Sequence, residues 1–145
     1  MNPARHPNRA THLRVGLAVL GAVILVGSVV PVPGGVPETE PTGTVGITTL
    51  AHIAGYAALA AGGVVYAGLT GWPATTRRLS THQSKTVGGW IAVVLVVSLF
   101  GVATELIQAM IPWRTAAVSD VVINTVSAVC GALVAGAMRF YASGE

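Results

Sequence analysis

The chain has 145 residues, of which 52% are hydrophobic and only 9% are charged, whereas soluble domains carry about 25% charged residues. So few charges exclude a water-soluble globular protein, because they could not cover a surface that faces water. The net charge of +3 comes from basic residues in short clusters between apolar runs. Because no aromatic residues interleave with these bases, the pattern also argues against a nucleic-acid-binding face.

Four apolar stretches follow one another along the chain, at about residues 15–32, 45–69, 88–111 and 118–141. Each is close to the roughly 20 residues that a helix needs to cross the hydrocarbon core of a bilayer. Helix-breaking residues separate the stretches: Pro31, Pro33, Gly34, Gly35, Pro37 and Pro41 after the first, Gly71 and Pro73 after the second, and Pro112 after the third. We therefore predict an all-α integral membrane four-helix bundle that forms a single domain over residues 1–145.

The first stretch has two interpretations. A basic beginning followed by a short apolar run also resembles a secretory signal peptide. No small-x-small cleavage site stands clearly before the proline-rich segment, so we expect this helix to be retained as an anchor or packing wall. Cleavage, the alternative, would leave the orientation of the other three helices unchanged.

Basic residues predict how the bundle is oriented. Four spans place seven of the eight on one side of the membrane: Arg5, Arg9, Arg14, Arg77, Arg78, Lys85 and Arg139. Cytoplasmic loops are enriched in Lys and Arg, so this side is predicted to be the cytoplasm, with both termini inside. The eighth, Arg114, falls on the outer side. We therefore predict a multi-pass protein of the cell membrane.

Small residues recur at helical spacing and predict close packing between helices. In lipid, such faces let helix backbones approach one another. Ala54, Ala58 and Gly62 share one face of the second helix, and the fourth helix carries Ser127, Gly131 and Ala135 on one face with Ala128, Ala132 and Gly136 beside it. Bundle assembly is their predicted role, and a homo-oligomer remains open.

Polar side chains inside the apolar runs are the candidate functional residues, because a charge near the bilayer centre costs at least ~2.5 kcal/mol. With Arg114 in the loop after the third helix, they form three pairs: His52 with Tyr56, Glu105 with Gln108, and Asp120 with Asn124. Residues three or four apart share a helix face, so each pair points one way. His52 and Glu105 both lie roughly 10 Å from the outer ends of their helices. We predict that all seven residues meet in the outer half of the membrane.

Other polar and aromatic residues in the runs have simpler interpretations. Hydroxyl side chains can bond to their own helix backbone and need no further role, as we expect for Ser28, Ser98 and Thr104. Trp113, like the other two tryptophans, is expected to anchor at the headgroup level. Cys130 is the sole cysteine, which excludes an intrachain disulfide and a cysteine-based zinc site, and we expect it to be a packing residue.

The candidate residues also carry a family resemblance. Residues 52–56, His-Ile-Ala-Gly-Tyr, resemble the His-x-x-x-Tyr signature of VanZ-like membrane proteins, and residues 101–108 resemble their G-x-x-x-E-L-x-Q segment. Their P-x-R…D-x-x-x-N-T segment is matched by Pro112, Arg114, Asp120, Asn124 and Thr125. The resemblance covers the last three helices, about two thirds of the chain, and departs from the family pattern at four positions: Thr48, Thr49, Ile53 and Ser127.

The family is named for a protein associated with low-level resistance to the glycopeptide teicoplanin, so the resemblance implies a role in the cell envelope. The leading hypothesis is an outward-facing site that binds or modifies an envelope lipid or glycan. Glu105 and Asp120 are its candidate acid and base, and His52 is its candidate proton shuttle. Arg114 would contact an anionic group through its planar fork. Three residues would orient the others: Tyr56, Gln108 and Asn124. Whether the chain is an enzyme is left open.

Three alternatives remain open. The polar set could be a buried network that only fixes helix register in a structural or interaction protein. Intramembrane acids and histidines also mark transport paths, although the cytoplasmic halves of the helices hold almost no polar residues. His52, Glu105 and Asp120 could supply a one-histidine, two-carboxylate metal set. Because no H-x-x-x-H or H-E-x-x-H pair is present, we predict no metal and no cofactor.

Overall fold

A computed structural model describes residues 7–31, 46–72, 82–114 and 116–142. These residues form four α-helices and no strand: α1 (Pro7–Val29), α2 (Ile47–Thr70), α3 (His82–Ala109) and α4 (Val118–Ala142). Each helix contains a segment of at least 22 residues that is long and apolar enough to cross a membrane. The all-helical prediction is therefore confirmed, and the chain is a multi-pass membrane protein by the length and composition of its helices.

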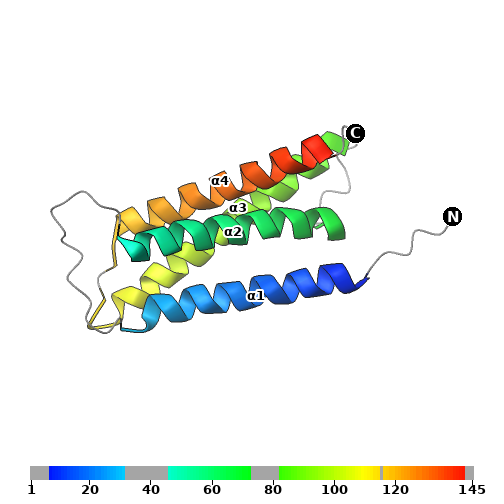
Figure 1. Ribbon diagram of the computed structural model, residues 1–145. Coiled ribbons are helices and arrows are strands. Elements are labelled where there is room, and N and C mark those ends of the chain that lie inside the picture. Colours follow the sequence, from blue (N-terminus) through cyan, green and yellow to red (C-terminus); the bar gives the residue numbers. More distant parts are fainter. Residues whose placement is uncertain (1–6, 32–45, 73–81, 115, 143–145) are drawn as a thin grey trace.

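Successive helices run in opposite directions, so that α1 begins and α4 ends at the same end of the bundle (Figure 1). α2 lies between α1 and α4 in this view, and α3 crosses behind them. The most extensive helix contact joins α2 and α4, whereas α1 contacts α2 and, less extensively, α3. α1 is thus the peripheral helix of the bundle.

The core lies where α2, α3 and α4 meet. It consists of nine buried residues: Tyr56, Ala60, Val64 and Ala67 from α2, Val93 and Val97 from α3, and Ala128, Ala132 and Ala135 from α4. Most are small, which lets the backbones approach closely. A Cβ added at Gly131 of α4 would overlap the backbone of Ala57 on α2.

The small-residue prediction is confirmed for the fourth helix. For the second it holds only at Gly62, where an added Cβ would lie 2.7 Å from the Leu17 side chain of α1. All six predicted residues of α4 are buried. On α2, however, Ala54 and Ala58 are exposed, and the packed face is instead the one that carries Tyr56 and Ala60. The spacing of small residues shows that a helix face could pack closely, but it does not determine which face turns inward.

Large apolar side chains cover the outside of the bundle, as lipid contact requires. α1 shows this most clearly, because only 6% of its apolar window is buried inside the protein, against 39% for α4. Val15, Val19, Val23 and Val26 of α1 are all exposed. α1 therefore packs largely against lipid, in agreement with its predicted role as an anchor or wall.

Helix boundaries differ from the predicted ones mainly at the polar ends. α1 begins at Pro7 and α3 at His82, eight and six residues before their apolar stretches. Hydropathy marks the part of a helix that lies in lipid, and a helix can continue beyond it; proline is also tolerated in a first turn. Gly71 ends α2 in a left-handed conformation with φ of 72°, and its N–H donates to the Ala67 carbonyl.

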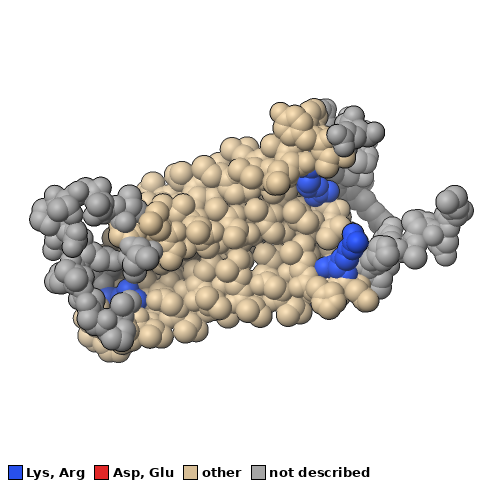
Figure 2. Space-filling view, viewed as in Figure 1, with Lys and Arg blue, Asp and Glu red and all other residues tan. Residues whose placement is uncertain are grey.

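Basic side chains occupy both ends of the bundle (Figure 2). Arg9 and Arg14 lie in the first part of α1, and Arg139 lies in the last turn of α4, at the end of the bundle that those two helices share. Arg114 follows α3 at the opposite end. This arrangement agrees with the predicted grouping. Arg5, Arg77, Arg78 and the predicted proline-rich segment 33–41 lie outside the described residues, as does the side chain of Lys85.

Candidate functional site

Buried polar side chains gather at the end of the bundle where α1 and α3 end and α2 and α4 begin. We call this group the polar cluster and define it by eight residues: Ser28, His52, Tyr56, Thr104, Glu105, Gln108, Arg114 and Asn124. Six of them are buried, and His52 and Arg114 are partly exposed. Each of the four helices contributes at least one of these residues, and the segment after α3 contributes Arg114. All seven predicted candidates lie at this end of the bundle, and six of them belong to the polar cluster.

The last turn of α1 receives hydrogen bonds from the end of α3 and the loop after it. A helix leaves its final four carbonyls without intrahelical partners. Arg114 Nη2 donates to the carbonyls of Gly27 (3.2 Å) and Val30 (2.8 Å), and the Trp113 indole N–H donates to Val29 (3.3 Å). These bonds hold the lipid-exposed α1 against the rest of the bundle by its backbone.

Ser28 connects α1 to both α2 and α3. Gln108 Nε2 donates to the Ser28 carbonyl at 2.9 Å, and the Ser28 hydroxyl lies 3.4 Å from His52 Nε2. The histidine tautomer decides which of the last two groups donates. With the bonds from Arg114 and Trp113, and with Val26 accepting from the Val30 N–H, every one of the four final carbonyls of α1 has a donor.

Tyr56 sits at the centre of the cluster and is fully buried. Its hydroxyl donates to Thr104 Oγ1 at 3.3 Å, and Thr104 in turn donates to the Phe100 carbonyl four residues earlier at 2.9 Å. The Tyr56 ring meets the His52 ring edge-on, with centroids 6.1 Å apart. Tyr56 thus couples the histidine of α2 to α3.

Glu105 faces the beginning of α4. Its Oε2 accepts a hydrogen bond of 3.3 Å from the Ala117 N–H, one residue before α4 begins. A helix N-terminus favours a negative charge, because its N–H groups carry a partial positive charge. This partial positive charge lowers the cost of burying a negative charge on Glu105, which is only 5% exposed.

Asn124 presents a buried amide without a hydrogen-bond partner among the described residues. The side chain is 1% exposed, and neither Oδ1 nor Nδ2 is bonded. It packs beside Gly101 and Tyr56: a Cβ added at Gly101 would lie 3.2 Å from the Asn124 Cβ and 3.3 Å from the Tyr56 ring. Leaving such a group unbonded costs about 1–3 kcal/mol, so this amide is an unused donor and acceptor next to the ring of Tyr56.

Asp120 is the one candidate that the structure does not join to the cluster. It lies in the first turn of α4 and is partly exposed. Its Oδ1 accepts a hydrogen bond from the Ser119 hydroxyl at 3.3 Å, and no hydrogen bond links it to the cluster among the described residues. Nor do His52, Glu105 and Asp120 form a group able to hold a metal ion, since the described residues contain no such group of three.

Three cluster contacts were not expected from the sequence. The sequence predicts only backbone bonds for Ser28 and Thr104 and only an interfacial role for Trp113, yet each contacts another helix. Ser98 differs in another way, because its buried hydroxyl has no hydrogen-bond partner in the described part of the chain, its own helix included. The position of Ser28 near the outer end of its stretch, at the depth of His52, was the available signal for its role.

Chemically, the cluster combines an imidazole, a carboxyl group, a phenol and two amides within a water-poor setting. Below it, the described core consists mainly of apolar residues such as Ala60, Val64 and Val97, with the buried hydroxyls of Ser98 and Ser127 as the polar groups. Comparison of the chain with protein-family models, with curated proteins and with solved structures found no match.

Proposed function

We propose that the chain is a VanZ-like membrane protein whose polar cluster binds or modifies an envelope lipid or glycan from the outer side of the membrane. The resemblance of residues 52–56, 101–108 and 112–125 to the family's segments supports the proposal. A contribution to teicoplanin resistance is the most specific form of it.

Orientation supports the outer side. The cluster lies at the end of the bundle opposite the described basic residues Arg9, Arg14 and Arg139. Because basic residues favour the cytoplasmic side, the cluster end then faces outward. A ligand would reach it from the envelope, where lipids and glycans carry many hydroxyl and anionic groups.

The unbonded amide of Asn124 is the observation that carries the proposal. A network that only fixed helix register would gain stability from satisfying this buried group, because a half-satisfied network is worse than an apolar one. The amide offers two N–H donors and one carbonyl acceptor beside Tyr56. We assign it to ligand binding.

Other residues of the cluster receive their roles from their contacts. The Arg114 Nε is buried and has no hydrogen-bond partner among the described residues; it is the donor we assign to an anionic ligand group, while Nη2 holds α1. Glu105 and His52 are the groups able to exchange protons. Tyr56 contacts the His52 ring, and Gln108 bonds to Ser28, whose hydroxyl lies beside His52. Asp120, which lies apart from the cluster, is assigned to the entrance.

A pair of matched substitutions tests the proposal. Asn124→Leu removes the unbonded amide and keeps the side chain's size, so thermal stability in detergent is expected to stay at or above that of the wild type. Gln108→Leu removes a donor to α1 and should lower stability by about 0.5–1.5 kcal/mol. In a host where the wild-type chain raises teicoplanin tolerance, Asn124→Leu should abolish the effect.

Two outcomes contradict the proposal. If the Asn124→Leu variant folds and keeps wild-type teicoplanin tolerance, the amide has no role in function. If the wild-type chain does not change teicoplanin tolerance, the proposed contribution to teicoplanin resistance is wrong.

A structural or interaction protein is the second candidate, and the hydrogen bonds from Gln108, Trp113 and Arg114 to α1 favour it. In that case the cluster stabilises the bundle and nothing more. It predicts that Asn124→Leu leaves every phenotype intact, and that function follows stability across variants of the cluster.

A further inference from the structure

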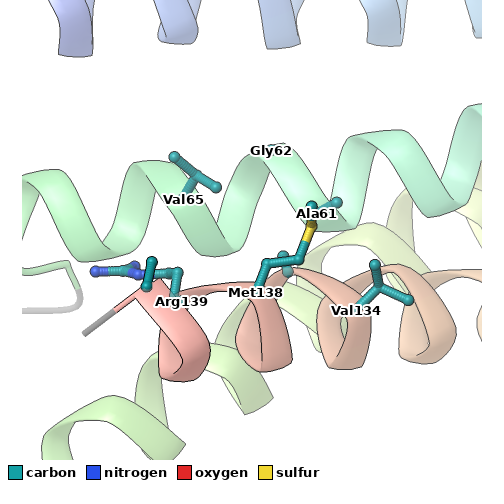
Figure 3. A pocket seen from close by; sticks show the side chains of 8 residues that line it. Ala61, Gly62, Val65, Val134, Met138 and Arg139 are labelled. Atoms are coloured by element: carbon teal, nitrogen blue, oxygen red, sulfur yellow. The ribbon is translucent and has the colours of Figure 1, made fainter. Parts of the chain in front are cut away.

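An open groove separates parts of α2 and α4 at the end of the bundle away from the polar cluster (Figure 3). Its volume is about 310 Å³, and its walls include Ala61 and Val65 of α2 and Val134 and Met138 of α4. Pockets for small molecules begin at about 300 Å³. Neither the polar cluster nor the proposed function uses this groove.

Arg139 is the charged residue of the groove lining. It lies in the last turn of α4, and its Nη1 donates to the Val64 carbonyl of α2 at 3.1 Å. The guanidinium rests directly on Gly68, where any Cβ would overlap it. A guanidinium has five N–H donors, so the exposed Arg139 keeps donors for a further partner while α2 fixes its position.

Charge at this end of the bundle is positive throughout the described residues. Arg9, Arg14 and Arg139 lie there, whereas the two described acidic residues, Glu105 and Asp120, belong to helix segments at the other end. The groove therefore combines an apolar lining with a positively charged residue at one end. An anionic amphiphile matches both features.

We propose that this groove binds an anionic phospholipid, with its phosphate on Arg139 and an acyl chain between α2 and α4. The planar fork of arginine suits phosphate oxygens. In Figure 3, Arg139 lies toward the end of α4 and Val134 lies deeper along the helix, which is the order of a headgroup and its chain. Basic pockets between helices are suited to anionic headgroups. The inference does not depend on the proposed function of the polar cluster.

Native mass spectrometry of the full chain in detergent tests the site. The probes are phosphatidylglycerol and phosphatidylcholine with identical acyl chains, and the wild type is expected to bind phosphatidylglycerol more tightly. Arg139→Gln should weaken phosphatidylglycerol binding about fivefold, which is the effect of losing one basic contact. Arg14→Gln removes the same charge from the same end outside the groove and is expected to change binding little.

Val65→Trp is the complementary variant, because it fills the groove and keeps Arg139. It should lower the occupancy of phosphatidylglycerol, with circular dichroism showing an unchanged helix content. Equal losses in Arg139→Gln and Arg14→Gln would overturn the site in favour of diffuse attraction. So would undiminished binding by Val65→Trp, full competition by inorganic phosphate alone, or a wild-type dimer that Val65→Trp dissociates, since a second copy would then fill the groove.

Discussion

Gly131 sets the distance between the two most closely packed helices. The backbone of Ala57 occupies the space that a Cβ at this position would need, and backbone cannot move aside as the end of a flexible side chain can. The same reasoning does not apply to Gly16 of α1, which has nothing within 4 Å of its Cβ position. The two glycines therefore form a matched pair.

Gly131→Ala is expected to lower the stability of the protein by about 1–3 kcal/mol, the usual cost of overpacking. Gly16→Ala should be neutral or stabilising by up to about 1 kcal/mol, because alanine has the higher helix propensity. Thermal unfolding in detergent measures both. Equal stability of the two variants would contradict the close contact between α2 and α4.

At the level of helices, hydrogen bonds to backbone carbonyls help to hold the end of α1 that lies beside the polar cluster. Arg114 bonds to two of its carbonyls, and most of its side chains face lipid. A helix attached in this way should loosen when one donor is lost, while the core of α2, α3 and α4 stays intact.

Arg114→Gln is therefore expected to broaden the distribution of distances between α1 and α2 without unfolding the bundle. Spin labels at the exposed positions Val26 and Ile53, with Cys130→Ala as background, report that distance by pulsed electron paramagnetic resonance. Arg14→Gln, on the same helix but far from the attachment, serves as the control. A distribution as narrow as that of the control would show that Arg114 does not hold α1.

The helices themselves were predictable, because each apolar run is long enough to dominate local preferences. Candidate residues such as Glu105 and Asn124 were also predictable, since polar groups in apolar runs are conspicuous. Their partners were not. Gln108 and Arg114 bond to backbone carbonyls of α1, and no side-chain pattern in a sequence reveals a backbone acceptor. The separation of Asp120 from the cluster likewise depends on how α4 is rotated, which spacing alone does not determine.

For the whole molecule, orientation in the membrane is the main prediction. Asn8 and Ser119 are exposed residues close to opposite ends of the bundle. In a background with Cys130→Ala, Ser119→Cys is expected to react with a membrane-impermeant thiol reagent added outside intact cells. Asn8→Cys should react only after the membrane is opened, because the basic end is predicted to face the cytoplasm. The reverse labelling pattern would show that the bundle has the opposite orientation, with the polar cluster on the cytoplasmic side.

The hydrogen bonds to the last carbonyls of α1 affect how freely the sequence of this helix can vary. A carbonyl is the same in every residue, so Gln108, Trp113 and Arg114 recognise a helix end at a given depth rather than a particular sequence. The exceptions are side-chain contacts: Ser28 through its hydroxyl near His52, and Leu17 and Ile24, which pack beside Gly62 and Gly55 of α2. Homologues should therefore tolerate wide variation along the lipid-facing side of α1, provided that its length, this serine and the apolar residues packed on α2 are kept.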